Sequence, residues 1–243
     1  MKIRVQRKIE VFPTFQRKFL SAALESAEKF GKNTGVHPEV FINLYKNSSN
    51  VEVRVFTDFD SLAQYEDLFL HKVLKDSKYL DAAESLYDMI VDEPQDEMYV
   101  RMDTEDFFLS KKHKVKPGAH INLKHDANLN KRRGTYRIER EYCASKGRLA
   151  DVMKMNFDFA ERFKIGTGHS IDYFCTRFSA ARIGCSKIFF DPDECPECGP
   201  AFLEQDQEIA QVEGLLKTPP MTTVYKRVDA ALVSYNLAKR QAV

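Results

Sequence analysis

Hydrophobic and charged side chains alternate with a period of two over residues 3–11, which is typical of a β-strand with one covered face. Over residues 19–30 the apolar positions follow a helical period, and Gly35 is placed to end that helix. The same patterns predict strands at 40–45, 51–57 and 98–102, with a long helical stretch from Asp60-Ser61 to about residue 90 that is broken near Asp76-Ser77. The first part of the chain therefore has the order βαββαβ, which defines the ferredoxin-like unit.

The second part of the chain repeats this order. It predicts strands at 136–143, 170–178, 183–190 and 222–228, helices at 147–164 and 199–217, and a helix-like tail from Asp229.

Sliding the sequence against itself by 133 residues brings residues 3–35 over 136–168 with seven identities. At the same shift Arg54-Val55-Phe56 meets Lys187-Ile188-Phe189, and at a shift of 126 Tyr99 meets Tyr225. The matches keep their order along the chain, which indicates an internal duplication. The predicted parts are a first repeat at 1–103, a basic connector at 104–134, a second repeat at 135–228, and a helical tail at 229–243.

A βαββαβ unit covers one face of its sheet with helices and leaves the other face open. Two such units in one chain can pack sheet to sheet, so the predicted fold class is α+β, with the two sheets packed face to face inside one molecule. Both repeats carry a Phe-x-Asp-x-Asp turn between a strand and a helix, formed by Phe56, Asp58, Asp60, Phe189, Asp191 and Asp193.

In these features the chain resembles the dimeric α+β barrel superfamily, fused in tandem. The resemblance implies that the two units close an intramolecular α+β barrel with a central pocket. The superfamily includes cofactor-free oxygenases of polycyclic phenols, haem-degrading oxygenases, tandem proteins similar to chlorite dismutase, and members without assigned activity, so it leaves the reaction open.

Composition narrows the class of protein. The net charge is +1 over 243 residues, which argues against a dedicated nucleic-acid partner. The sequence has no apolar run long enough for a membrane span and no apolar core for a signal peptide near the N-terminus, so we expect a cytoplasmic protein. The five cysteines are too sparse for a disulfide scaffold, and we expect reduced thiols. A homo-oligomer is compatible with these features.

One side of the predicted strands is unusually polar. It carries Arg4, Arg54, Asp58, Tyr99 and Arg101 in the first repeat. The second repeat has the counterparts Arg137, Glu139, Lys187, Asp191, Tyr225 and Arg227. Buried charges must pair with one another or meet a ligand or water. This face therefore indicates either structural charges, solvated or joined in internal ion pairs, or a pocket for an aromatic or anionic small molecule.

Arg7 and Arg140 interrupt the apolar side of equivalent strands. Each needs a carboxylate or an anionic ligand beside it, and both alternatives stay open. His37 and His169 follow the Thr-Gly helix ends and could serve as acid, base or axial haem ligand, or lie exposed in loops. His169 is favoured because Tyr173 follows on the same side of the next strand.

Cys195 and Cys198 form a CxxC motif, which could bind metal, undergo redox chemistry or be a loop feature. The predicted connector carries eight Lys and Arg against three acidic residues. Such a segment could attract anionic ligands but is more often simply solvated.

The functional prediction is a small-molecule enzyme, an oxygenase acting on an aromatic or polycyclic substrate. His169 is its acid/base, with Arg7 and Arg140 as oxyanion anchors, and the substrate-binding residues are Tyr173, Tyr225, Tyr99 and His37. It needs no cofactor, or haem in the alternative; a non-catalytic binding module is the other alternative. No metal is predicted apart from the CxxC motif.

Overall fold

The computed structural model describes residues 2–44, 49–73, 75, 81, 84–102, 135–167, 171–176, 185–190, 205, 207–229 and 233. The chain divides into two compact units, one formed by residues 1–98 with 225–243 and the other by residues 99–224. Two strands are divided between the units: residues 95–101 begin in the first unit and end in the second, and residues 221–227 begin in the second unit and end in the first. None of the described helices is long and apolar enough to cross a membrane.

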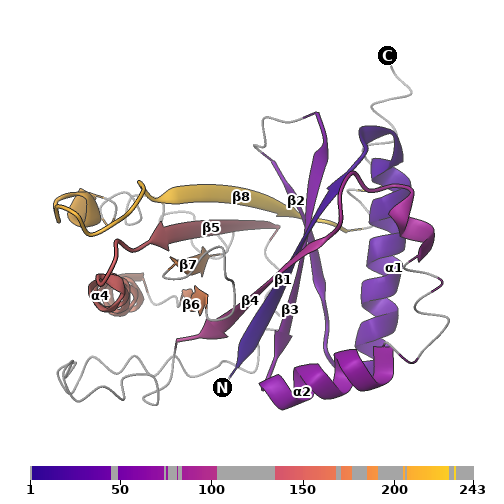
Figure 1. Ribbon diagram of the computed structural model, residues 1–243, viewed down its shortest axis with the longest axis horizontal. Coiled ribbons are helices and arrows are strands. Elements are labelled where there is room, and N and C mark those ends of the chain that lie inside the picture. Colours follow the sequence, from indigo (N-terminus) through magenta and orange to yellow (C-terminus); the bar gives the residue numbers. More distant parts are fainter. Residues whose placement is uncertain are drawn as a thin grey trace. The chain divides into compact units, whose positions relative to one another are not determined.

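The first unit contains three complete strands and one long helix (Figure 1). Strand β1 (Ile3–Val11) leads through the short turn η1 (Pro13–Phe15) into α1 (Gln16–Thr34). Strands β2 (Glu39–Asn43) and β3 (Val51–Phe59) follow. Gly35 ends α1 with a φ of 75°, a left-handed conformation that glycine adopts without a steric penalty, and its N–H bonds to the carbonyl of Gly31.

The predicted long helix after residue 60 is interrupted. It begins as α2 (Leu62–Glu66), capped by the Ser61 side chain, and continues as the π-helical segment η2 (Asp67–Val73). Strand β4 (Gln95–Arg101) then begins three residues earlier than the alternation predicted.

The second unit repeats the plan. Strand β5 (Tyr136–Cys143) leads to α4 (Leu149–Thr167), then to β6 (Asp172–Thr176) and β7 (Cys185–Phe190). Residues 207–210 are helical, and β8 (Met221–Arg227) closes the repeat. The predicted connector and most of the predicted tail lie outside the described residues.

The strand order is β1-β3-β2-β8-β5-β7-β6-β4, the order of a closed eight-stranded antiparallel barrel. The fold is thus the predicted α+β barrel of two ferredoxin-like repeats. The central pocket stays a prediction.

Strand register confirms the duplication. Strand β1 pairs with β3 so that Lys8 lies opposite Arg54 and Glu10 opposite Glu52. Strand β5 pairs with β7 in the same register, because adding 133 to each number gives the observed pairs Glu141–Lys187 and Cys143–Cys185. A one-residue slip would move every side chain to the other face, so identical registers are strong support for two copies of one plan.

Helices cover one face of each sheet. In the first unit, Phe19 and Leu20 of α1 pack on a group of apolar strand residues that includes Ile9, Val40 and Val53. In the second unit, residues of α4 such as Phe157 and Phe163 pack with Tyr173 and Ile188. The opposite face of each sheet is the polar side predicted from the alternation.

Candidate functional site

Each unit carries a polar sheet face, which we define by its strand residues. In the first unit it comprises Arg4, Gln6, Lys8, Glu10, Glu39, Phe41, Asn43, Glu52, Arg54, Phe56, Asp58, Tyr225 and Arg227. In the second unit it comprises Glu139, Glu141, Cys143, Asp172, Phe174, Thr176, Cys185, Lys187, Phe189, Tyr99 and Arg101.

A cation lies over a buried tyrosine ring on both faces. The guanidinium of Arg54 is 5.9 Å from the ring centre of Tyr225. The ammonium of Lys187 is 4.8 Å from the ring centre of Tyr99. Arg54 and Lys187 are equivalent at the shift of 133, and Tyr99 and Tyr225 at the shift of 126. The two pairs are therefore copies of one arrangement, in which the tyrosine comes from the last strand of the other repeat.

The arginine two residues after each of these tyrosines, in β8 and in β4, makes an equivalent ion pair. Arg227 lies 2.6 Å from Glu39, and Arg101 lies 3.0 Å from Asp172. Glu39 and Asp172 are again related by 133. The end of β8 thus contributes a tyrosine ring and an arginine paired with a carboxylate to the first polar face. The end of β4 contributes the same two groups to the second polar face.

Aromatic rings continue the first face. Phe41 contacts Phe56 edge to face at 5.4 Å, and Phe56 contacts Tyr225 at 5.8 Å. The guanidinium of Arg227 lies over Phe41 at 4.8 Å, and that of Arg4 over Phe56 at 5.9 Å. On the second face Phe174 and Phe189 repeat the edge-to-face contact at 5.5 Å. Rings flanked by cations favour a flat, electron-rich ligand.

Carboxylates also form ion pairs with Arg4 and with the two cations that lie over the tyrosine rings, Arg54 and Lys187. Arg4 forms two bonds to Asp58 at 2.6 and 2.7 Å, and Arg54 bonds to Glu52 at 2.8 Å. Lys187 bonds to Glu139 at 2.6 Å and lies 3.3 Å from Glu141. Internal ion pairs, one of the two alternatives that the sequence left open, are therefore present on both faces.

Arg7 lies on the helix-covered side of β1, facing away from Tyr225. It forms two hydrogen bonds to Asp96, at 2.7 and 2.6 Å, and both side chains are half-exposed. Its guanidinium also lies over the ring of Phe69. Burial and the charge of Asp96 raise the pKa of the neighbouring Tyr65 hydroxyl, which Arg7 partly opposes. A structural carboxylate thus accounts for this arginine.

Arg140 is buried on the helix-covered side of β5, opposite Ile188. Tyr173 lies on the same side of the sheet, with its ring 5.0 Å from Phe157. Burial raises the pKa of the Tyr173 hydroxyl well above its usual value, so it stays protonated at neutral pH. Of the predicted tyrosines, Tyr99 and Tyr225 lie on the polar faces, whereas Tyr173 does not.

His37 is exposed just after α1. Its ring lies so close to Gly31 that a Cβ there would come within 2.2 Å of Nδ1, so glycine makes this approach possible. His169, Cys195 and Cys198 lie outside the described residues.

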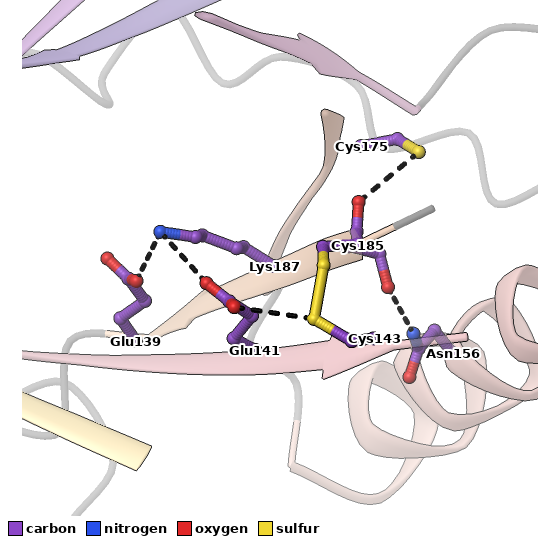
Figure 2. Close-up of a disulfide and its surroundings, with 8 residues drawn as sticks. Glu139, Glu141, Cys143, Asn156, Cys175, Cys185 and Lys187 are labelled. Atoms are coloured by element: carbon purple, nitrogen blue, oxygen red, sulfur yellow. Dashed lines mark hydrogen bonds and ion pairs between the residues drawn. A yellow bond between two sulfur atoms is a disulfide. The ribbon is translucent and has the colours of Figure 1, made fainter. Parts of the chain in front are cut away.

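The expectation of reduced thiols is wrong for two of the five cysteines. Cys143 and Cys185 form a disulfide on the polar face of the second unit (Figure 2). They are directly opposed on β5 and β7, a proximity that depends on register and not on their distance along the chain. Among the described residues Cys175 is a buried thiol outside the disulfide, and burial raises its pKa to about 11.

The alternation of side chains predicted that four cationic residues lie on the polar side, but none of them was among the predicted site residues: Arg54, Lys187, Arg101 and Arg227. Glu39 and Asp172 were not predicted as site residues either. The shift of 126 that aligns the Tyr-x-Arg strand ends was the available signal, because a tyrosine and an arginine two positions apart share one face of a strand.

Comparisons with known proteins bear on the fold. No family model matches this chain, and no curated protein sequence matches it. Solved structures do match, and the likeness is one of fold.

Two of these structures are provisionally named monooxygenases. One is from Fusobacterium nucleatum subsp. nucleatum, with a TM-score of 0.59 and 9% identity, covering 94% of this chain and 93% of the other. The second is from Lactobacillus acidophilus, with a TM-score of 0.55 and 8% identity, covering 93% of both chains. A provisionally named chlorite dismutase gives a TM-score of 0.54 and 10% identity, covering 98% of this chain and 100% of that one. At such identities the likeness shows the fold alone.

Proposed function

We propose that this chain is a small-molecule oxygenase that acts on an aromatic or polycyclic phenol without a tightly held cofactor. The observation that carries the proposal is the pair of equivalent cation–tyrosine contacts, Arg54 with Tyr225 and Lys187 with Tyr99. The provisional monooxygenase names of the fold neighbours support the same reaction class.

The proposed chemistry follows from what an ionised phenol can do. Removing its proton makes the ring electron-rich enough to reduce oxygen, and nearby cations stabilise the oxyanion. A ring CH₂ group can then become a carbonyl, with one oxygen atom of O₂ entering the product and the other leaving as water. The substrate supplies all four electrons, so no external reductant is required.

We assign the anchoring role to Arg54 and Lys187 instead of Arg7 and Arg140. Arg7 and Arg140 both lie on the helix-covered side of their sheets, away from Tyr225 and Tyr99, whereas Arg54 and Lys187 lie on the polar faces beside these rings. Tyr99 and Tyr225 keep their proposed role as walls and hydrogen-bond donors. His169 remains the proposed base.

Oxygen uptake with a panel of polycyclic phenols tests this function. We expect uptake without added metal, flavin or reductant, and we expect Tyr99→Phe and Tyr225→Phe to lower kcat by about 10²-fold, the usual loss for one oxyanion donor. Tyr87, which is 57% exposed, provides the matched control, since Tyr87→Phe should leave the rate unchanged.

Two results would overturn the proposal. One is the absence of uptake with every phenol in the panel. The other is a Soret band on adding haemin together with uptake that requires haemin, because this would assign the chemistry to haem.

A further inference from the structure

The disulfide on the second polar face lies beside the carboxylate of Glu141, which takes no part in the disulfide bond. Glu141 Oε1 is 3.5 Å from the sulfur of Cys143. The sulfurs of Cys143 and Cys185 and a carboxylate oxygen of Glu141 all lie within 4.8 Å of one another. Two sulfurs and one carboxylate oxygen converging on a point form a ligand set suited to zinc.

We propose that reduction of the Cys143–Cys185 disulfide creates a zinc site formed by these two thiolates and Glu141. A dithiol reductant supplies two electrons and two protons to the disulfide, giving two thiols. Zn²⁺ then binds both sulfurs and displaces both thiol protons to solvent. The bridge and the metal exclude each other, so the redox state of the pair controls zinc binding.

The observed spacing is close to what zinc requires. Zn–S bonds of about 2.3 Å and Zn–O bonds of about 2.1 Å in a tetrahedron place their ligand atoms about 3.6–3.8 Å apart. The carboxylate oxygen is already at 3.5 Å from one sulfur. Once the disulfide bond opens, the two sulfurs can move apart to this spacing while they stay opposed on β5 and β7.

Lys187 orients the carboxylate (Figure 2). Its ammonium lies 3.3 Å from Oε2 of Glu141, while Oε1 is directed at the sulfur of Cys143. Groups that hold a metal ligand in this way are a regular feature of zinc sites. Three protein ligands would leave the fourth position open to water or a small ligand.

The first unit provides an internal comparison. At the positions equivalent to Cys143, Cys185 and Glu141 it has Glu10, Glu52 and Lys8. Lys8 lies 3.3 Å from Glu10, and Arg54 lies 2.8 Å from Glu52, so both carboxylates have a cation. The second unit has two sulfurs in place of these carboxylates and a carboxylate in place of Lys8, so the zinc-type ligand set occurs in one copy of an otherwise shared arrangement.

Zinc titration against a chromophoric chelator tests the proposal on the full-length chain. Cys195→Ser and Cys198→Ser are introduced first, so that the CxxC motif cannot contribute. With a phosphine reductant we expect one zinc ion per chain, bound with a Kd below about 1 μM. The oxidised protein should bind none.

Variants identify the ligands. Glu141→Gln keeps both cysteines and so can fold with the native bridge; after reduction it should bind zinc at least about 10-fold more weakly. Cys143→Ser should also weaken the thiolate-to-metal absorption band seen with Co²⁺. Cys175→Ala, which removes a buried thiol outside the disulfide, should leave zinc binding unchanged.

The proposal fails if the reduced protein binds no zinc in this range, which would make the bridge structural only. It also fails if zinc binding is equally tight in Glu141→Gln, or survives the joint replacement Cys143→Ser and Cys185→Ser. None of these readouts depends on oxygenase activity, so the proposed function and the zinc site can be rejected separately.

Discussion

Replacing Lys187 by methionine is expected to lower the free energy of unfolding at pH 7 by about 3–5 kcal/mol, the usual cost of breaking a buried ion pair on one side. Lys187 is 1% exposed, and its partners Glu139 and Glu141 are 5% and 8% exposed. Methionine keeps most of the aliphatic length but removes the cation that both carboxylates share. Urea denaturation of the oxidised protein measures the change.

Two control variants separate charge from packing. Lys29, whose side chain is 71% exposed and paired with Glu25, should tolerate methionine with a change of at most about 0.5 kcal/mol. Adding Glu139→Gln and Glu141→Gln to Lys187→Met should restore most of the lost stability, since the uncompensated charges are then gone. If Lys187→Met alone costs no more than Lys29→Met, the three charges do not form the buried cluster described.

Reducing the Cys143–Cys185 disulfide in zinc-free buffer is expected to lower the free energy of unfolding by about 4 kcal/mol. The bridge joins residues 42 apart, and a closed loop of that size restricts the unfolded chain by roughly this amount in the chain-entropy account. Urea denaturation with and without reductant measures the difference.

The joint variant Cys143→Ser and Cys185→Ser is the matched control, because it has no bridge to lose. The reductant should leave its stability unchanged. Equal losses on reduction in this variant and in the native chain would assign the effect to another pair of cysteines and contradict the prediction.

The alternation of side chains was enough to predict the two polar faces, because a period of two fixes which residues share a side of a strand. It correctly grouped Arg54 with Asp58, and Lys187 with Glu139. The ordered matches between the two repeats also indicated two copies of one fold, and the common register of β1–β3 and β5–β7 confirms this.

The partners across each face could not be predicted in the same way. The contact of Arg54 with Tyr225 requires the end of β8 to join the first unit, and alternation within one strand says nothing about such an exchange. From the sequence, the partner of Arg7 could be either a carboxylate or a ligand. Asp96 is 89 residues away along the chain, and the fold brings it next to Arg7.

The disulfide illustrates a missed inference. Had the pairing of Glu10 with Glu52 been predicted, the shift of 133 would have placed Cys143 opposite Cys185. Cysteine spacing alone could not suggest the bridge, since a separation of 42 residues carries no information on which strands are neighbours.

The proposed function requires that the equivalent cation–tyrosine pairs bind a flat phenolic ring. Titration with a hydroxyanthraquinone, a polycyclic phenol that oxygen does not consume, tests it most directly through the change in dye absorbance. We predict saturable binding with a Kd on the order of 10 μM, weakened at least about 10-fold when Tyr99→Phe and Tyr225→Phe are combined and unchanged in Tyr87→Phe. Binding that does not saturate, or an equal Kd in all three proteins, would contradict the claim.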